Sequence, residues 1–210
     1  VNRLLLEALR AGAIHQVGKR KARRFLKAVD AFERAEEERW ERLRAGTLPG
    51  SGLSTQAQIN QTMMQGYDLL RRRDRQGAVD VWLETWELIK ELAKPRMRTV
   101  EMFDKAYPRL VQMVFNWTSD LEMELGNAGL DNPVYHEHRV RFVDELLAHF
   151  PEEDDARRLQ MLRAKGEALF YLGRQDEGDA VYRDLVDRYP DEAWAHIGWS
   201  DAYAFGQGMA

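Results

Sequence analysis

The tripeptide His136-Glu137-His138 is the part of this 210-residue sequence whose residue types come closest to metal or acid–base chemistry. Imidazole and carboxylate groups bind zinc and carry protons near neutral pH. In a helix, however, residues two apart point to different sides, and a metal-binding helix needs histidines four positions apart. We therefore expect these side chains to lie at the surface or to cap a helix, and we predict no metal site.

The other residues with catalytic potential are better explained by helix structure. The acid pairs Glu122/Glu124 and Asp154/Asp155 suit a helix flank and a helix cap, respectively. The sequence has no glycine-rich phosphate loop and no G-x-S-x-G elbow. The absence of cysteine excludes disulfides and thiolate ligands. We therefore predict no catalytic residue, no metal ion and no cofactor.

Composition is typical of a helical protein without a membrane span. Hydrophobic residues make up 44% of the chain and charged residues 31%, and the formal net charge of −4 excludes no class of partner. No apolar run approaches the roughly 18–20 residues that cross a membrane. We therefore expect no membrane association and a cytoplasmic location.

The stretch 157–204 has the pattern of two short amphipathic helices followed by a third. Small or apolar residues recur at helical spacing over 159–172, and Gly173 suits the left-handed position that ends a helix. A second apolar stripe follows and ends at Pro190, and a third helix is expected from Ala193. Short helices of this kind bury their apolar faces by stacking on neighbours.

An earlier stretch, 55–93, repeats this spacing and predicts a second helical hairpin. Between the two hairpins we expect helices at 99–106, 109–126 and 134–150, with a loop at 127–133. The whole chain is then expected to contain about ten helices and no strand. The matched positions are Gly66 and Gly166, Leu69 and Leu169, Ala78 and Gly178, and Trp82 and Tyr182.

The run 166–190 resembles one tetratricopeptide repeat. Gly166 stands at the small position of the first helix of such a unit. Gly178 and Tyr182 stand at the small and aromatic positions of its second helix, and Pro190 closes the unit. The later phrase from Trp194 to Tyr203 is also similar to bacterial repeat proteins of unassigned function.

The resemblance implies an all-α fold, in which antiparallel helical hairpins form an α-solenoid wound as a right-handed superhelix. We expect this repeat domain over residues 53–206. A linker rich in glycine and serine, residues 46–54, separates it from an N-terminal helical arm, residues 1–46. The composition of the linker leads us to expect proteolysis there first.

Repeat stacks bind extended peptides or partner helices in the groove lined by the first helix of each hairpin. We therefore expect a non-catalytic interaction module with a protein or peptide partner. The resemblance places the groove positions at Asn60, Met63, Tyr67 and Arg71 in one hairpin and at Gln160, Arg163, Glu167 and Tyr171 in the other.

The alternative function is binding of nucleic acid or another acidic polymer through a basic cluster in the arm. Six basic residues fall within nine positions, and they oppose the helix dipole, so helix stability does not explain them. A solvated helix face is the simpler interpretation of such a charge run. The cluster consists of Lys19, Arg20, Lys21, Arg23, Arg24 and Lys27.

The expected last helix, 193–205, is apolar around most of its circumference. A terminal helix of a stack normally presents a polar outer face, because nothing packs on it. An exposed apolar patch is unusual in a monomer. The N-terminal arm, a further C-terminal segment or a second copy of the chain could cover this patch, and we favour self-association into a homodimer through Trp194 and Tyr203.

Overall fold

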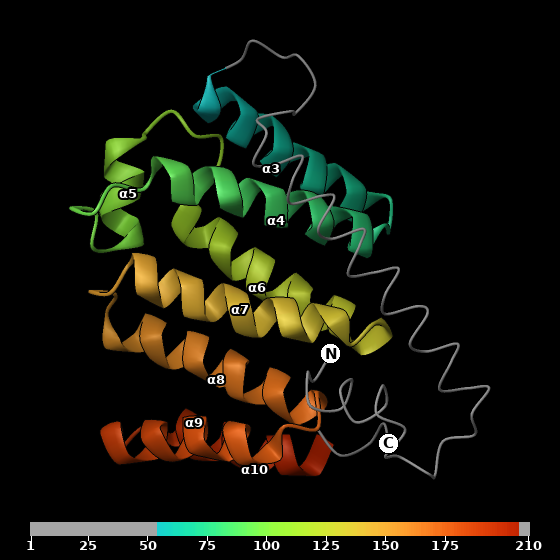
Figure 1. Ribbon diagram of the computed structural model, residues 1–210, viewed down its shortest axis with the longest axis vertical. Coiled ribbons are helices and arrows are strands. Elements are labelled where there is room, and N and C mark those ends of the chain that lie inside the picture. The colour runs from blue at the N-terminus through green and yellow to red at the C-terminus, as the bar shows by residue number, and fades with distance from the viewer. Residues whose placement is uncertain (1–53, 206–210) are drawn as a thin grey trace, which may run out of the picture. The chain divides into compact units, whose positions relative to one another are not determined.

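The computed structural model describes residues 54–205, which form eight α-helices and contain no strand (Figure 1). These residues belong to the second of the two units into which the chain divides, Leu53–Ala210. The expected all-α architecture is confirmed for this part, whereas the arm at 1–46 and most of the linker at 46–54 lie outside the described residues. The helices are α3 (Thr55–Arg71), α4 (Arg75–Leu92), α5 (Val100–Ala106), α6 (Val114–Asp131), α7 (Val134–His149), α8 (Asp155–Tyr171), α9 (Gln175–Arg188) and α10 (Ala193–Phe205).

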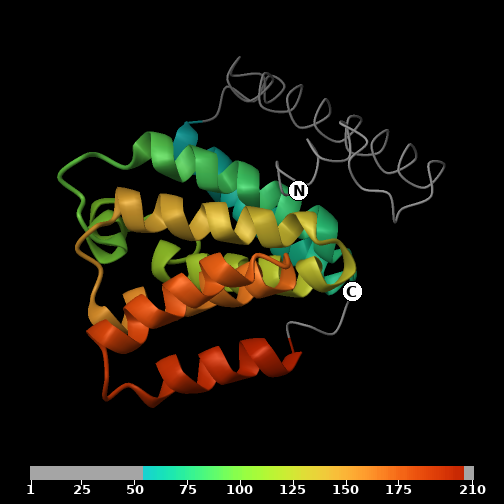
Figure 2. The same cartoon turned by 60° about the horizontal axis from the view of Figure 1, so that its bottom comes forward.

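The helices pack largely in the order in which they follow one another in the sequence. The closest pairs are α3 with α4, α6 with α7, α7 with α8, and α8 with α9. Figure 1 shows these helices as successive layers, with the short helix α5 at one side. The last helix, α10, rests on α8 and α9 and forms one end of this unit (Figure 2).

The hairpin α3–α4 is held by two side-chain caps and one buried tryptophan. Ser54 accepts a hydrogen bond at the start of α3, and Asp74 does the same for α4. Trp82 is fully buried, and its indole Nε1 donates to the carbonyl oxygen of Met63 at 3.1 Å. A Cβ on Gly66 would lie 2.0 Å from that indole nitrogen, so a glycine is needed for the two helices to approach this closely.

The hairpin α8–α9 repeats these contacts at positions shifted by 100 residues. The hydroxyl of Tyr182 donates to the carbonyl oxygen of Arg163 at 3.2 Å, as Trp82 does to Met63. A Cβ on Gly166 would lie 2.7 Å from the Tyr182 ring. The turns also correspond, because Arg73 and Gly173 have φ values of 65° and 70°. The spacing seen in the sequence therefore reflects two hairpins of the same internal geometry.

In the middle of the unit, helix α6 begins and ends at other residues than the sequence predicts. The helix begins at Val114 and not at Arg109, because the Asp104 carboxylate accepts hydrogen bonds from the backbone N–H groups of Val114 and Phe115. It continues to Asp131 through the expected loop. Gly129 stands within it because the His136 ring lies where its side chain would be.

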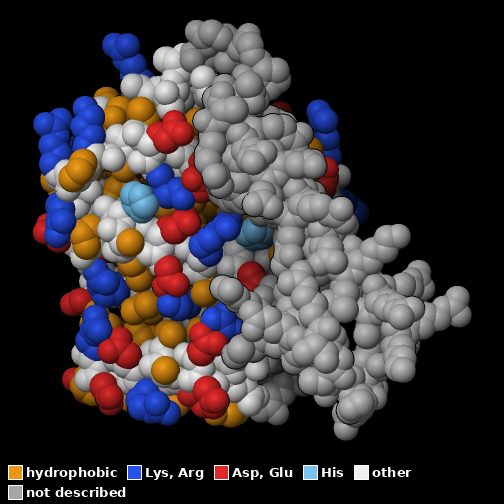
Figure 3. Space-filling view, viewed as in Figure 1, with side chains coloured by type: hydrophobic (Ala, Val, Ile, Leu, Met, Phe, Trp, Pro, Cys, Tyr) orange, Lys and Arg blue, Asp and Glu red, His pale blue; other side chains and the backbone are white. Residues whose placement is uncertain are grey.

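The surface in Figure 3 carries lysine, arginine, aspartate and glutamate side chains intermixed, without a large area of one sign among the coloured residues. Across residues 54–205 the structure contains no helix that is both long and apolar enough to cross a membrane.

Candidate functional site

A cavity of about 320 Å³ lies between α8 and α10 and is here called the α8–α10 pocket. One face of α8 forms its main wall, because the lining residues of that helix recur at spacings of three and four. The other walls come from α6, α7, α9 and α10. The residues that line the pocket and carry polar side chains are Glu122, Arg139, Gln160, Arg163, Glu167, Tyr171, Tyr182 and Asp201.

All four groove positions expected in the second hairpin, Gln160, Arg163, Glu167 and Tyr171, line this one pocket. Sequence comparison with a repeat could place them, because they share one face of one helix. Glu122, Arg139 and Asp201 were missed, since they come from α6, α7 and α10 and meet only through tertiary packing. The one sequence signal near them is Gly198, a glycine inside a helix, which can allow another helix to approach closely.

A buried ion-pair network forms one side of the pocket. Arg139 donates from Nε to Glu122 and from Nη1 to Glu167, each at 2.7 Å. The side chains of Arg139 and Glu122 are only 10% and 8% exposed, so their charges are compensated mainly by each other. The Arg139 guanidinium is thus already engaged by two carboxylates and is not available as the first anchor for a ligand.

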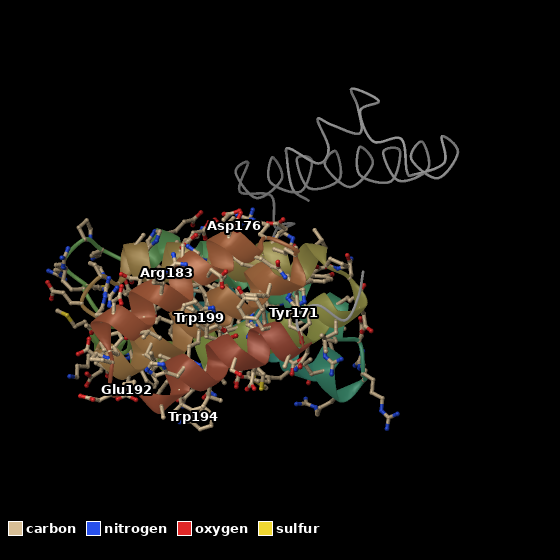
Figure 4. All side chains as sticks on the ribbon, turned by 90° about the horizontal axis from the view of Figure 1, so that it is seen from below. Tyr171, Asp176, Arg183, Glu192, Trp194 and Trp199 are labelled. Atoms are coloured by element: carbon tan, nitrogen blue, oxygen red, sulfur yellow. The ribbon has the colours of Figure 1, made fainter. Side chains whose placement is uncertain are left out.

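Arg163 is held in a different way. Its guanidinium lies 5.3 Å from the ring centroid of Trp194, and its Nε approaches the backbone of Gly198, where an added Cβ would lie 2.9 Å away. Figure 4 shows Trp194 projecting from α10 at the edge of the molecule. The Nε atom is buried and has no hydrogen-bond partner. Within residues 54–205 no carboxylate forms an ion pair with Arg163.

The aromatic wall of the pocket rests on a buried histidine. The rings of Tyr171 and His136 are stacked, with centroids 4.7 Å apart and an interplanar angle of 4°. Both ring nitrogens of His136 are buried without a hydrogen-bond partner. Burial, and next the charge of Arg139, lower the pKa of His136 to about 4, so the ring is neutral at physiological pH.

The surface or capping role expected for His136 and His138 is wrong. They are 2% and 7% exposed, because α7 packs between α6 and α8 and is therefore covered on two sides. Among the residues that the structure describes, no group of three or more histidine and acidic side chains could hold a metal ion.

Three of the four groove positions expected in the first hairpin are buried or engaged by neighbouring segments. Met63 is fully buried and so cannot line an open groove. Asn60 bonds the backbone of Arg109 and Val111, and the Tyr67 hydroxyl donates to Asp120 at 2.5 Å. Asn60 is thus engaged by the segment that precedes α6, and Tyr67 by α6 itself. Arg71 is exposed near the end of α3 and pairs with its neighbour Asp68.

Trp194 and Tyr203 do not form one patch, which corrects the expectation of a single apolar surface. They are 58% and 45% exposed, but they are nine positions apart, which places them about half a turn from each other around the helix axis. The Tyr203 hydroxyl donates to Asp179 at 2.7 Å, and its ring contacts Phe170. Trp194 lies beside Arg163 of α8, whereas Tyr203 lies beside Asp179 of α9.

The basic cluster from Lys19 to Lys27 lies outside the described residues. Searches against protein-family models, curated proteins and solved structures find no match for this chain. The function must therefore be argued from the pocket itself.

Proposed function

We propose that this chain is a non-catalytic interaction module that binds a peptide or partner segment in the α8–α10 pocket. The observation that carries the proposal is the convergence of Gln160, Arg163, Glu167 and Tyr171 on one cavity. The resemblance to a tetratricopeptide repeat predicts these four as groove positions independently of the cavity. The exposed ring of Trp194 beside Arg163 adds the kind of aromatic and arginine anchor that is enriched in binding hot spots.

We further propose that the hairpins are tetratricopeptide-like and form a short solenoid. The support is the agreement of α3–α4 with α8–α9 in the aromatic-to-carbonyl hydrogen bond, the glycine contact and the left-handed turn residue. Largely sequential packing of the helices is what a stack of such units requires.

Binding is favoured over catalysis by the state of the titratable groups that line the pocket. Glu122 and Glu167 are engaged by Arg139. Burial raises the pKa of Tyr182, whose hydroxyl donates to a backbone carbonyl. A nucleophile needs an adjacent base within hydrogen-bond distance, and no such pair is formed among these lining residues.

A peptide-display selection on the full chain tests the proposal. Enriched peptides should lose at least about tenfold in affinity on Arg163→Glu, which places a negative charge at the hot spot, since a charged hydrogen bond contributes that much. Arg183→Glu is the matched control, because Arg183 is exposed on the side of α9 away from Trp194 (Figure 4). Circular dichroism would verify that both variants fold.

Peptides that bind wild type and Arg163→Glu equally well would contradict the proposed site. Titration against salt separates the alternative function, because binding of nucleic acid through lysine and arginine weakens steeply as salt rises. If a nucleic acid binds strongly and no peptide can be selected, the result would favour the alternative function, in which the basic cluster of the arm is the binding site.

A further inference from the structure

We propose that the α8–α10 pocket recognises a zwitterionic group, with the ligand's carboxylate on Arg163 and its ammonium or guanidinium on Asp201. This inference rests on the proposed binding function and names the ligand chemistry. It follows from which charges in the pocket are already paired and which are not.

Three of the five charged side chains that line the pocket are paired with one another and together carry a net charge of −1, and the Glu167 carboxylate is also 45% exposed to solvent. Arg139 holds Glu122 and Glu167 in hydrogen-bonded ion pairs of 2.5–2.7 Å. The remaining two are Arg163 and Asp201, and neither has an ion-pair partner among residues 54–205. The pocket therefore presents one positive and one negative group that are free to meet a ligand.

The guanidinium of Arg163 is held in a position in which it can bind an anion. It contacts the Trp194 ring on one side and the backbone of Gly198 on the other, and both contacts restrict its movement. A restrained guanidinium loses less entropy when it forms the paired N–H donations that a carboxylate accepts. Its Nε is buried against α10, so the terminal Nη groups of the guanidinium are the donors that a bound carboxylate would meet.

Asp201 is placed to receive the other end of the same ligand. It follows Gly198 by three residues, so the two lie on the same face of α10, and both line the pocket. It is exposed, and it forms no ion pair with Arg163 although both line the cavity. A ligand with one charge would satisfy one of these groups and leave the other unpaired.

The size and the walls of the cavity fit a ligand of amino-acid size. Its volume of about 320 Å³ lies at the lower end of the range of roughly 300–1,000 Å³ for small-molecule pockets. The rings of Tyr171 and Tyr182 supply apolar surface for the body of the ligand. Two sources share this chemistry, namely a free α-amino acid and neighbouring acidic and basic side chains of a peptide.

Calorimetric titration of the full chain distinguishes the sources. The probe for the free source is L-leucine, compared with N-acetyl-leucine and leucinamide, which each keep only one charge. The probes for the peptide source are the blocked dipeptides N-acetyl-Glu-Lys-amide and N-acetyl-Lys-Glu-amide. We expect either L-leucine or the blocked dipeptides to bind. Each single-charge analogue should bind at least about tenfold more weakly.

Near-isosteric variants tie that binding to the two side chains. Arg163→Gln and Asp201→Asn should each weaken the zwitterionic probe at least about tenfold. The exposed residues Arg183 and Asp176 provide the matched controls Arg183→Gln and Asp176→Asn, which should bind as wild type does. Melting temperatures would show whether a variant lost binding through unfolding.

Three results would overturn the inference: no zwitterionic probe binds at millimolar concentration, a single-charge analogue binds as tightly, or both pocket variants bind normally. Failure here is distinguishable from failure of the proposed function. Selected peptides that still depend on Arg163 while no zwitterion binds would refute only the ligand chemistry. A free amino acid that binds when no peptide can be selected would refute only the peptide-binding role.

Discussion

Arg73 and Gly173 occupy the same turn position in the two corresponding hairpins, with φ values of 65° and 70°. A side chain in the left-handed region costs roughly 1–2 kcal/mol, whereas glycine adopts it freely. One hairpin therefore has the residue type that its turn requires, and the other does not.

Arg73→Gly should raise the free energy of unfolding by about 0.5–1 kcal/mol, because it removes backbone strain without removing a buried contact. Gly173→Ala should lower it by about 1 kcal/mol, since nothing lies within 4 Å of the added Cβ and the strain acts alone. Urea denaturation measures both changes. The control is Arg72→Gly, where φ is −85°, and a gain there equal to that of Arg73→Gly would refute the argument.

The buried His136 makes stability depend on pH in a definite direction. Its pKa is lowered from 6.5 to about 4 in the folded chain. Above about pH 6.5 the ring is neutral in both states, and no stability is lost. As pH falls from about 6.5 to about 4, the unfolded chain takes up a proton that the folded chain does not, so stability should fall by up to about 3 kcal/mol.

The measurement is the difference in the free energy of unfolding between wild type and His136→Leu, taken as a function of pH. The variant should lose the slope between about pH 6.5 and pH 4 that this residue contributes. Identical slopes in wild type and His136→Leu would show that the ring is accessible to protons.

At the scale of elements, close packing between paired helices depends on glycine. Gly66→Ala would place a Cβ 2.0 Å from the buried Trp82 indole, and Gly166→Ala would place one 2.7 Å from the Tyr182 ring. Overpacking of this kind costs about 1–3 kcal/mol. Gly66→Ala should therefore destabilise the chain more than Gly166→Ala, as measured by the midpoint of urea denaturation. The reverse order would mean that α3 and α4 separate more easily than α8 and α9.

The two hairpins could be located from the sequence, whereas the ends of α6 could not. Repeated spacing identifies α3–α4 and α8–α9, because local contacts fix their geometry. Asp104 caps α6 from ten residues away, and no local pattern reveals that. Gly129 and its neighbours have the composition of a loop, yet Gly129 is required inside the helix by the His136 ring of α7.

At the scale of the whole molecule, the exposed face of α10 still predicts self-association, which would compete with a ligand for the Trp194 ring. Trp194 and Ile197 are 58% and 42% exposed and lie three residues apart, which puts them on neighbouring positions of the helix. Trp194→Glu should therefore convert a dimer to a monomer, whereas Tyr203→Glu should not, because Tyr203 contacts Asp179 and Phe170.

Light scattering at roughly tens of micromolar chain measures this, as a twofold dimer would bury the same face twice. A wild type that stays monomeric would contradict the prediction.

Of the polar residues that line the pocket, only half could be predicted from the sequence. The positions on α8 follow from one helix face, while Asp201 reaches the cavity through the packing of α10 against α8 and α9.

The position of α10 at one end of the unit couples ligand binding to local unfolding. A helix of 13 residues is marginal in water when isolated, so α10 should lose its hydrogen bonds whenever it separates from α8 and α9. Each such opening also removes Asp201 and Gly198 from the pocket. A ligand that bridges α8 and α10 must then slow amide hydrogen exchange in α10 in proportion to its occupancy, while exchange in α3 and α4 stays unchanged.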